Sequence, residues 1–239
     1  MEEMSGMYQA ILFDLDGTLL PMDMDGFTKG YMSMLAKAMA PFGYQAEALI
    51  PAVWKGVSAM VKNDGSRPNS EVFFEVFAQK LGPEVYNYID VLDNFYKTEF
   101  KKASAFTGAN PLAKKAVELA KTKAEKVILA TNPLFPPSGV ETRLGWIGLS
   151  FDDFAYVTHY ENSHYCKPNP EYYRELLKEA GCDPAKCLMI GNDVQEDVEA
   201  ASAVGMEAFL VTDCAISRGE MPECLKGSFE ELIGYLEKI

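Results

Sequence analysis

Short runs of apolar residues that end in polar ones recur along the chain. They lie at residues 9–13, 127–130, 154–157, 187–190 and 208–211, and the run at 154–157 is the weakest. Runs of this length are typical of buried strands in a parallel sheet. Segments with helical patterns separate them, at residues 112–123, 171–180, 197–205 and 229–239. Strands that alternate with helices predict βαβ units and an α/β fold with a parallel sheet.

The ends of these helical segments carry residues that start and stop helices. Asn110, followed by a proline, is typical of a helix start. Gly181 comes directly after the segment that begins at Pro170, as a helix-terminating glycine does. Ser228 and Glu231 have the spacing of a capping box for the last helix.

Residues 21–106 interrupt the alternation and carry only helical patterns. Apolar side chains repeat there with the spacing of one helix face in four segments, which begin near Phe27, Ile50, Phe73 and Val85. Ser70 is a candidate cap for the third of these helices. The pattern therefore predicts an all-helical insertion at 21–106, placed directly after the first strand, and a core made of residues 1–20 and 107–239.

The charge balance limits the partners of the protein. The chain of 239 residues has 22 Lys and Arg against 35 Asp and Glu, which gives a net charge of −13. Such a surface repels nucleic acids and anionic membranes, so we expect neither as a partner. A small anionic substrate would need local positive charge, from lysines or a metal, at its site.

Targeting signals and disulfide patterns are both missing from the sequence. Residues 1–6 are acidic, where a signal peptide would be basic, and no apolar run approaches the roughly 20 residues of a membrane helix. The five cysteines form no CxxC pair. We therefore expect a cytoplasmic protein with reduced, mostly buried thiols, and an oligomeric state that the sequence leaves open.

Polar residues with catalytic potential follow the predicted strands. Asp14 and Asp16, with a glycine after them, end the first strand, and Thr131-Asn132 end the second. Lys167 lies in a loop, and Asp193 and Asp197 follow the fourth strand. Taken singly, each is typical of a turn, a cap or a solvated loop. The carboxyl ends of parallel strands meet at one edge of a sheet, however, so we expect these residues to converge.

One further acidic segment has the same sequence pattern as the first. Asp23-Met24-Asp25-Gly26 repeats the DxDG pattern, but no strand precedes it. We therefore expect it to be only a loop.

Together and in this order, the polar segments resemble the four motifs of the haloacid dehalogenase (HAD) superfamily. The matching residues are DLDGT at 14–18, Thr131-Asn132, Lys167-Pro168 and GNDVQED at 191–197. The resemblance covers the whole chain and implies a three-layer, Rossmann-like sheet with the helical insertion as a cap. Asn192 stands where the family usually has glycine, which we expect to leave the metal site intact while shifting the loop.

The resemblance also implies a role for each motif residue. Asp14 would be the nucleophile, Asp16 the general acid and base, and Thr131, Asn132 and Lys167 the phosphate-binding groups. Mg²⁺ would bind the Asp14 and Asp193 carboxylates and the Asp16 backbone carbonyl, while Asp197 would orient Lys167 or a metal-bound water. With Asp16 protonated, three carboxylates then face the three positive charges of Mg²⁺ and Lys167.

The expected function is hydrolysis of a small phosphorylated metabolite through an aspartyl-phosphate. Asp16 favours phosphate esters over other substrates, because the family's dehalogenases lack this second acid. A sugar phosphomutase similar to β-phosphoglucomutase would use the same residues, and it stays an alternative. A binding protein that keeps the fold without turnover is a second alternative. The sequence does not identify the substrate or the cap residues that select it.

Overall fold

A six-stranded parallel sheet forms the centre of the protein. The computed structural model describes residues 8–239, so the expectation for the acidic residues 1–6 lies outside the described chain. The strands are β1 (Tyr8–Phe13), β2 (Ala124–Leu129), β3 (Tyr156–Val157), β4 (Cys187–Gly191), β5 (Glu207–Val211) and β6 (Leu225–Gly227). Their order is β3-β2-β1-β4-β5-β6, so β1 lies between β2 and β4. The five expected strands are present, and β6 was not predicted.

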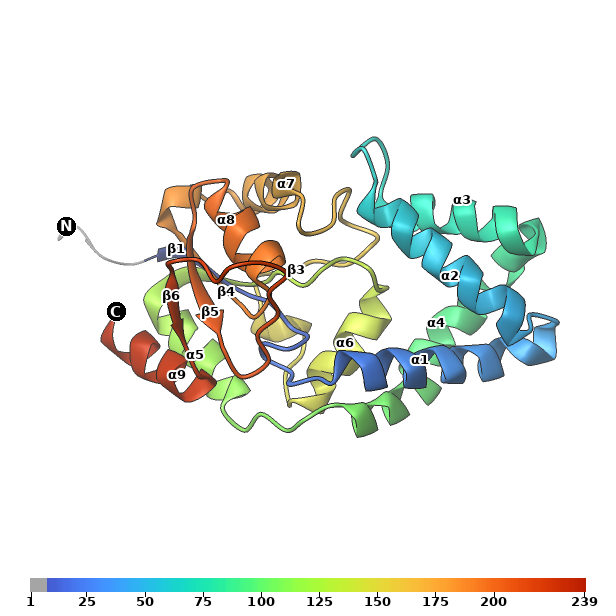
Figure 1. The fold of residues 1–239 in the computed structure, drawn as a ribbon, viewed down its shortest axis with the longest axis horizontal. Helices are drawn as coiled ribbons and strands as arrows, with labels where there is room; N and C mark the ends of the chain where they lie inside the picture. The colour runs from blue at the N-terminus through green and yellow to red at the C-terminus, as the bar shows by residue number, and fades with distance from the viewer. Residues whose placement is uncertain (1–7) are drawn as a thin grey trace.

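Helices cover both faces of this sheet, which makes the predicted three-layer α/β architecture correct. Adjacent residues of a strand point to opposite faces. Ile11 accordingly belongs to a buried cluster with side chains of α5 (Ala113–Lys123) and α9 (Phe229–Lys238). Leu12 belongs to a second cluster, with α7 (Pro170–Ala180) and the helical segment that follows β4. Figure 1 shows α5 and α9 on one side of the sheet and α7 and α8 on the other.

The remaining core helices are short or irregular. They are α6 (Pro137–Trp146), the 3₁₀ turns η4 (Phe151–Asp153) and η5 (Pro184–Lys186), the π-helical segment η6 (Val194–Glu199), and α8 (Ala200–Ser202). The helix expected at 197–205 thus begins earlier, at Val194, and its first turns are π-helical. Gly181 and the Ser228–Glu231 capping box end and start helices as predicted. Asn110 does not cap α5 directly; it caps the turn before it, by accepting a hydrogen bond from the Leu112 backbone N–H (3.1 Å).

Residues 24–106 form only helices, and they extend to one side of the sheet (Figure 1). These are α1 (Met24–Met39), η1 (Ala40–Phe42), α2 (Ala46–Val61), α3 (Asn69–Leu81), η2 (Pro83–Tyr88), α4 (Ile89–Lys97) and η3 (Glu99–Phe106). The loop expected at residues 23–26 is wrong, because α1 begins at Met24; Asp23 is its N-cap and accepts from the Gly26 backbone N–H. The expected cap at Ser70 is wrong, because α3 already begins at Asn69 after Pro68.

The helical segment contacts the rest of the chain at several places. The two chain crossings run side by side, since Met22 bridges Thr107 and the Gly108 N–H donates to the Pro21 carbonyl (2.7 Å). At the start of α3, the Asn69 N–H donates to the Ser163 carbonyl (2.9 Å). An aromatic cluster joins α1 and η3 to α6 and the loop before it, through Phe27, Tyr31, Phe100, Phe135 and Trp146. These contacts hold the helices over the carboxyl ends of the strands.

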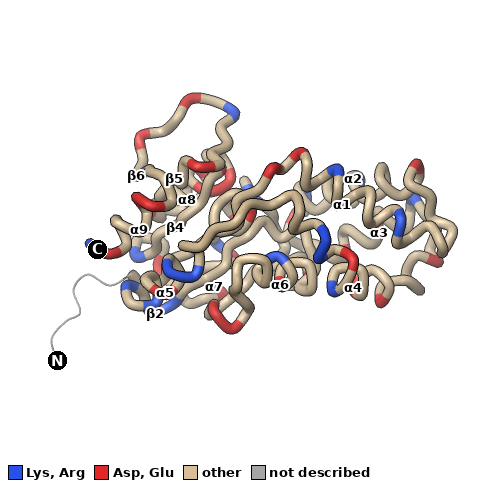
Figure 2. Tube along the Cα trace, turned by 90° about the horizontal axis from the view of Figure 1, so that it is seen from below, with Lys and Arg blue, Asp and Glu red and all other residues tan. Residues whose placement is uncertain are grey.

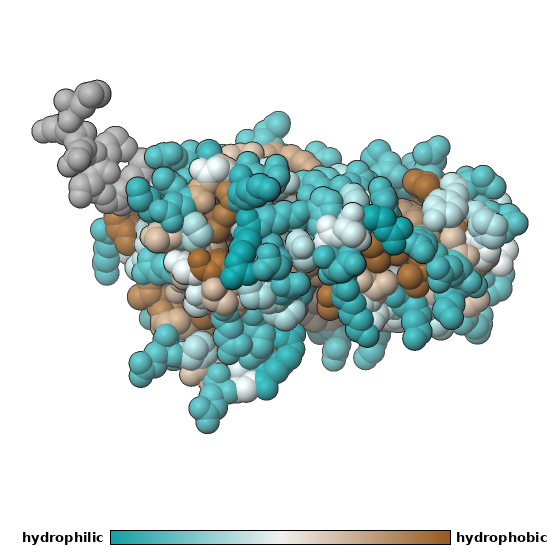
Figure 3. Space-filling view, turned by 90° about the horizontal axis from the view of Figure 1, so that it is seen from above, coloured by the Kyte–Doolittle hydropathy of each residue, from teal (hydrophilic) through white to brown (hydrophobic). Residues whose placement is uncertain are grey.

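The surface mixes charged residues of both signs with small apolar patches. Acidic and basic residues are both scattered along the trace in Figure 2, and the face in Figure 3 is mostly hydrophilic. No helix within residues 8–239 combines the length and the apolar character that a membrane span requires. All five cysteines are unpaired, but only Cys166 and Cys187 are buried, fewer than expected.

Candidate active site

Asp14 directly follows β1 at the carboxyl edge of the sheet. Its backbone N–H donates to the Ile190 carbonyl on β4 (2.9 Å), and the Ala130 N–H donates to the Phe13 carbonyl (2.8 Å). These bonds continue the pairing of β1 with its neighbours by one residue at each strand end. Asp14 therefore lies between the second and fourth motifs, and its side chain is buried.

Lys167 reaches Asp14 from the loop before α7. Its Nζ lies 3.0 Å from Asp14 Oδ1 and 2.7 Å from Asp197 Oδ1, and its side chain is fully buried. Burial alone would lower the pKa of Lys167, but the two carboxylates outweigh burial and raise the pKa of this ammonium well above its usual value. Lys167 therefore stays positively charged at neutral pH.

Asp197 holds Lys167 and the fourth motif together. Its Oδ2 accepts the backbone N–H groups of Asn192 and Asp193, both at 3.0 Å, while Oδ1 accepts from Lys167. A Cβ at Gly191 would lie 2.2 Å from the Asp197 carboxyl group, so only glycine permits this approach. Of the two roles considered for Asp197, this geometry favours the positioning of Lys167.

The turn after Asp14 depends on a glycine and on Asn192. Gly17 has a φ of +94°, a conformation that residues with a side chain rarely adopt. The Thr18 hydroxyl lies 3.2 Å from Asp14 Oδ2 and 3.0 Å from Asn192 Oδ1, so it can donate to either oxygen. Asn192 Nδ2 donates to the Cys214 carbonyl (2.8 Å). The asparagine that departs from the family pattern thus links the first motif to the fourth.

Asp16 contacts a residue that the sequence did not single out. Arg143, fully buried on α6, donates from Nη1 to Asp16 Oδ2. The other oxygen of this carboxyl, Oδ1, is buried and has no hydrogen-bond partner among the described residues. Burial raises the pKa of Asp16, and the Arg143 guanidinium opposes that rise. Since α6 itself had no predicted pattern, only the structure reveals Arg143.

Asp193 lies close to a second unpredicted arginine. Its Oδ1 accepts the backbone N–H groups of Gln195 and Glu196, and both carboxylate oxygens lie 2.9 Å from guanidinium nitrogens of Arg218. The Arg218 side chain is 56% exposed and comes from the loop after β5. Nothing in the sequence pattern of that loop indicated this contact.

The predicted metal ligands form an oxygen-only donor set. Asp14 and Asp193 offer buried carboxylates, and the backbone carbonyl of Asp16 is the third oxygen that the family resemblance implies. Hard oxygen donors of this kind suit Mg²⁺. Within residues 8–239, no three His, Cys, Asp or Glu side chains converge on one point. Two carboxylates and one carbonyl would leave coordination positions for water and substrate, which suits Mg²⁺.

The second motif lies next to this cluster. Thr131 is buried, and its backbone carbonyl accepts from the Thr158 hydroxyl (2.7 Å) and the Tyr172 hydroxyl (3.0 Å). Asn132 Nδ2 donates to Glu196 Oε2 (2.9 Å) and lies 3.3 Å from the Lys167 carbonyl. These bonds bring Thr131, Asn132, Lys167 and Glu196 to one edge of the sheet.

The charge balance of the site differs from the one expected. Glu196 adds a mostly buried carboxylate, and Arg143 and Arg218 each add a positive charge beside an acid. The acids therefore do not face Lys167 alone, and their mutual repulsion without a metal is weaker than the motif residues by themselves would produce. A cation that binds Asp193 would share this carboxylate with Arg218 or displace its guanidinium.

Comparison with known proteins identifies the family. The model of the haloacid dehalogenase-like hydrolase family matches residues 8–205, which is most of the chain. This protein therefore belongs to the haloacid dehalogenase-like hydrolases, as the four motifs indicated.

Among individual relatives, several are described as phosphatases. The candidate phosphatase YhcW of Bacillus subtilis is 29% identical over 86% of this chain and 84% of its own. The glyceraldehyde 3-phosphate phosphatase of Methanothermobacter thermautotrophicus is 26% identical over 86% of each chain. The HAD-hydrolase YfnB of Bacillus subtilis, solved with magnesium bound, covers 97% of this chain and 99% of its own, with a TM-score of 0.59 and 16% identity. At that identity the likeness concerns the fold.

The close contact between Gly17 and Asn192 predicts that a methyl group added at position 17 destabilises the fold. A Cβ at position 17 would lie 2.3 Å from Asn192 Nδ2, and Asn192 cannot move away without losing its bonds to Thr18 and Cys214. Gly17→Ala should therefore lower the free energy of unfolding through two costs. The left-handed backbone costs about 1–2 kcal/mol with any side chain, and overpacking against Asn192 costs about 1–3 kcal/mol more.

Gly43→Ala is the matched control for this prediction. Gly43 has nearly the same φ, +91°, but its Cβ would meet nothing within 4 Å. Urea denaturation should show a larger loss for Gly17→Ala than for Gly43→Ala. Equal losses would mean that the side chain of Asn192 does not constrain the turn.

Proposed function

We propose that this hydrolase is a Mg²⁺-dependent phosphatase that cleaves a small phosphate monoester through an aspartyl-phosphate at Asp14. The observation that carries the proposal is the buried Lys167 ammonium, 3.0 Å from Asp14 and held by Asp197. A permanent cation beside a carboxylate nucleophile is what a dianionic phosphoryl group needs in order to approach it. The phosphatases among the relatives favour the same chemistry.

The phosphoryl group would bind between the second and third motifs. Lys167 would contact one of its oxygens, with the Thr131 side chain and the backbone N–H groups of 131–132 beside it. The Asn132 amide already joins Lys167 and Glu196, so its part would be to hold these loops in register. Bound Mg²⁺, on Asp14, Asp193 and the Asp16 carbonyl, would neutralise phosphoryl oxygens and fix the geometry of attack.

Asp14 and Asp16 would share the two chemical steps. In the first, an Asp14 oxygen bonds to phosphorus while the ester P–O bond breaks and Asp16 gives its proton to the departing alcohol oxygen. In the second, water attacks phosphorus, Asp16 takes the proton of that water, and the bond between Asp14 and phosphorus breaks to release inorganic phosphate. The unpartnered Oδ1 of Asp16 offers the hydrogen-bonding position for both oxygens.

The helical segment 21–106 would act as a cap domain over the core of residues 1–20 and 107–239. The crossings near Pro21 and Thr107 lie side by side, as a hinge would require. Closure of the cap would exclude water from the acyl phosphate and limit the size of the substrate. We expect a small phosphorylated metabolite as substrate, and a cytoplasmic location that suits five unpaired cysteines.

The first test of this proposal is release of inorganic phosphate from small esters. The protein should release phosphate in Mg²⁺, and an excess of chelator should abolish the release, because several carboxylates would then face an anionic substrate. Asp14→Asn should reduce the rate by about 10³-fold or more, since the amide cannot form the acyl phosphate.

Circular dichroism of Asp14→Asn serves as the control for folding. Retained turnover in a folded preparation of this variant would contradict the assignment of the nucleophile. Transfer of the phosphoryl group to a second hydroxyl, with little free phosphate, would instead favour the mutase alternative.

If Asp16 is the general acid, the loss of rate in an Asp16 variant should depend on the leaving group of the ester. Asp16→Asn should slow an alkyl phosphate by about 10²–10⁴-fold, because the alkoxide must take a proton as it leaves. An aryl phosphate, whose oxygen hardly needs that proton, should be slowed much less. A loss of equal size on both esters would assign Asp16 a purely structural role at the metal site.

A further inference from the structure

A cavity of about 210 Å³ lies between the helical segment and the core, and Asp16 is one of its lining residues. Helices α1, α2, α3 and α4 line it from one side, and Leu134, Phe135 and Tyr160 line it from the core side. Nine of its eighteen lining residues are aromatic. The space in which the proposed leaving group would lie is therefore mostly apolar.

The walls of this cavity carry almost no charge. Asp16 is the single ionisable acid among the eighteen lining residues, and no Lys, Arg or His is among them. Arg143 is nearby, but its guanidinium carbon lies 4.2 Å from the ring centre of Phe135, and it binds Asp16. Arg143 Nη2 has no hydrogen-bond partner among the described residues, but Arg143 is not one of the lining residues. A carboxylate or second phosphate on the substrate would thus meet no cation on the cavity wall itself, and burying it unpaired would be costly.

The walls carry few hydroxyl groups, and two of these already hydrogen-bond to each other. The Tyr31 and Tyr96 hydroxyls lie 2.7 Å apart and hydrogen-bond to each other. Burial raises the pKa of Tyr31 to about 12, so this pair is neutral. A polyhydroxylated leaving group such as a sugar would leave several hydroxyls without partners here, and each unpaired buried hydroxyl is unfavourable.

The size of the cavity suits one ring. A dry apolar cavity of about 150 Å³ binds benzene. A volume of about 210 Å³ leaves room for a six-membered ring and the carbon that joins it to the ester oxygen. Ring stacking on Phe73, Phe77 or Phe135 would contribute beyond simple burial.

We propose, on the basis of the phosphatase function above, that the substrate is a phosphate monoester of a neutral, apolar, ring-containing alcohol. The alcohol lies in this aromatic cavity with its oxygen at Asp16. The juxtaposition of the acid that would protonate the leaving group with an uncharged aromatic wall carries the inference.

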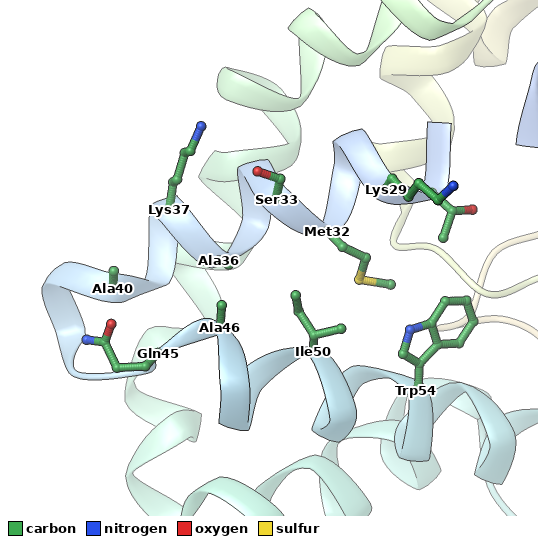
Figure 4. A pocket seen from close by; sticks show the side chains of 11 residues that line it. Lys29, Met32, Ser33, Ala36, Lys37, Ala40, Gln45, Ala46, Ile50 and Trp54 are labelled. Atoms are coloured by element: carbon green, nitrogen blue, oxygen red, sulfur yellow. The ribbon is translucent and has the colours of Figure 1, made fainter. Parts of the chain in front are cut away.

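A groove on the outside of the helical segment adjoins this cavity; its lining is mostly apolar but includes Lys29 and Lys37. It lies between α1 and α2, has a volume of about 640 Å³, and shares Thr28, Met32 and Trp54 with the cavity. In Figure 4, Met32, Ile50 and Trp54 point into the gap between the two helices. Trp54 is 48% exposed, so it stands where the cavity meets solvent and can contact the outer edge of the ring.

Two esters of the same shape test the inference. Cyclohexylmethyl phosphate and glucose 6-phosphate both carry the phosphate on a carbon attached to a six-membered ring, but only the second carries ring hydroxyls. Phosphate release in Mg²⁺ should give a kcat/KM at least about 100-fold higher for cyclohexylmethyl phosphate, a size of discrimination that an apolar pocket reaches against hydroxyls. Phosphoglycolate, which adds a carboxylate, should be the poorest of the three.

The outcomes separate this inference from the proposed function. A kcat/KM for glucose 6-phosphate or phosphoglycolate equal to or above that for cyclohexylmethyl phosphate would overturn the inference and leave the phosphatase. No release from any of the three esters, nor from acetyl phosphate, would overturn the phosphatase itself and the inference with it.

A matched pair of variants locates the binding surface. Trp54→Ala should raise the KM for cyclohexylmethyl phosphate by about tenfold, because an aromatic contact at the mouth of the cavity is lost. Phe42→Ala removes an aromatic ring of similar exposure (40%) that packs on Tyr88 outside the cavity, and it should leave this KM unchanged. Unchanged KM values in both variants would contradict binding of the alcohol in this cavity.

Discussion

The buried ammonium of Lys167 is the interaction on which the site depends. Taking a lysine fully out of water costs several kcal/mol unless anions compensate for it. Asp14 and Asp197 provide that compensation at 3.0 and 2.7 Å, and two backbone N–H groups hold Asp197 in turn. One positive charge thereby fixes the end of β1, the loop before α7 and the start of η6 relative to each other. Loss of the ammonium would leave buried carboxylates to repel one another.

Two glycines make this close packing of charges possible. Gly191 lets the Asp197 carboxyl approach the end of β4, and Gly17 turns the chain back under Asn192. In both places a Cβ would lie within 2.3 Å of another side chain. The hydrogen bonds of Thr18 and Asn192 then join the first and fourth motifs. The two segments that carry Asp14 and Asp193 of the proposed metal site are therefore directly connected.

The sheet and the main site residues were predictable because both follow from strand topology. Apolar runs identified β1, β2, β4 and β5, and parallel strands necessarily bring Asp14, Thr131 and Asp193 to one edge. Lys167 lies on a loop, so it was expected near this edge, but only the family resemblance gave it a role beside Asp14. Boundaries that depend on turn chemistry were less accurate, as the starts of α1, α3 and α5 show.

What the sequence did not reveal depends on contacts between distant segments. Arg143 and Arg218 meet Asp16 and Asp193 across 127 and 25 residues, and neither lies in a segment with a recognisable pattern. The aromatic cavity has the same origin, since its walls come from four helices and three core loops. Each helix alone shows an ordinary apolar face. Only their packing over Asp16 turns those faces into a binding surface.

Trapping the covalent intermediate tests the central claim most directly, which is that Lys167 and Asp197 position Asp14 as a nucleophile toward phosphorus. A single turnover with a phosphate-labelled ester in Mg²⁺, stopped with acid within milliseconds, should place the label on one peptide. Its site should be Asp14, in a bond that hydroxylamine cleaves, as an acyl phosphate requires. Turnover without any labelled peptide at any time, or with the label on a residue other than Asp14, would contradict the account.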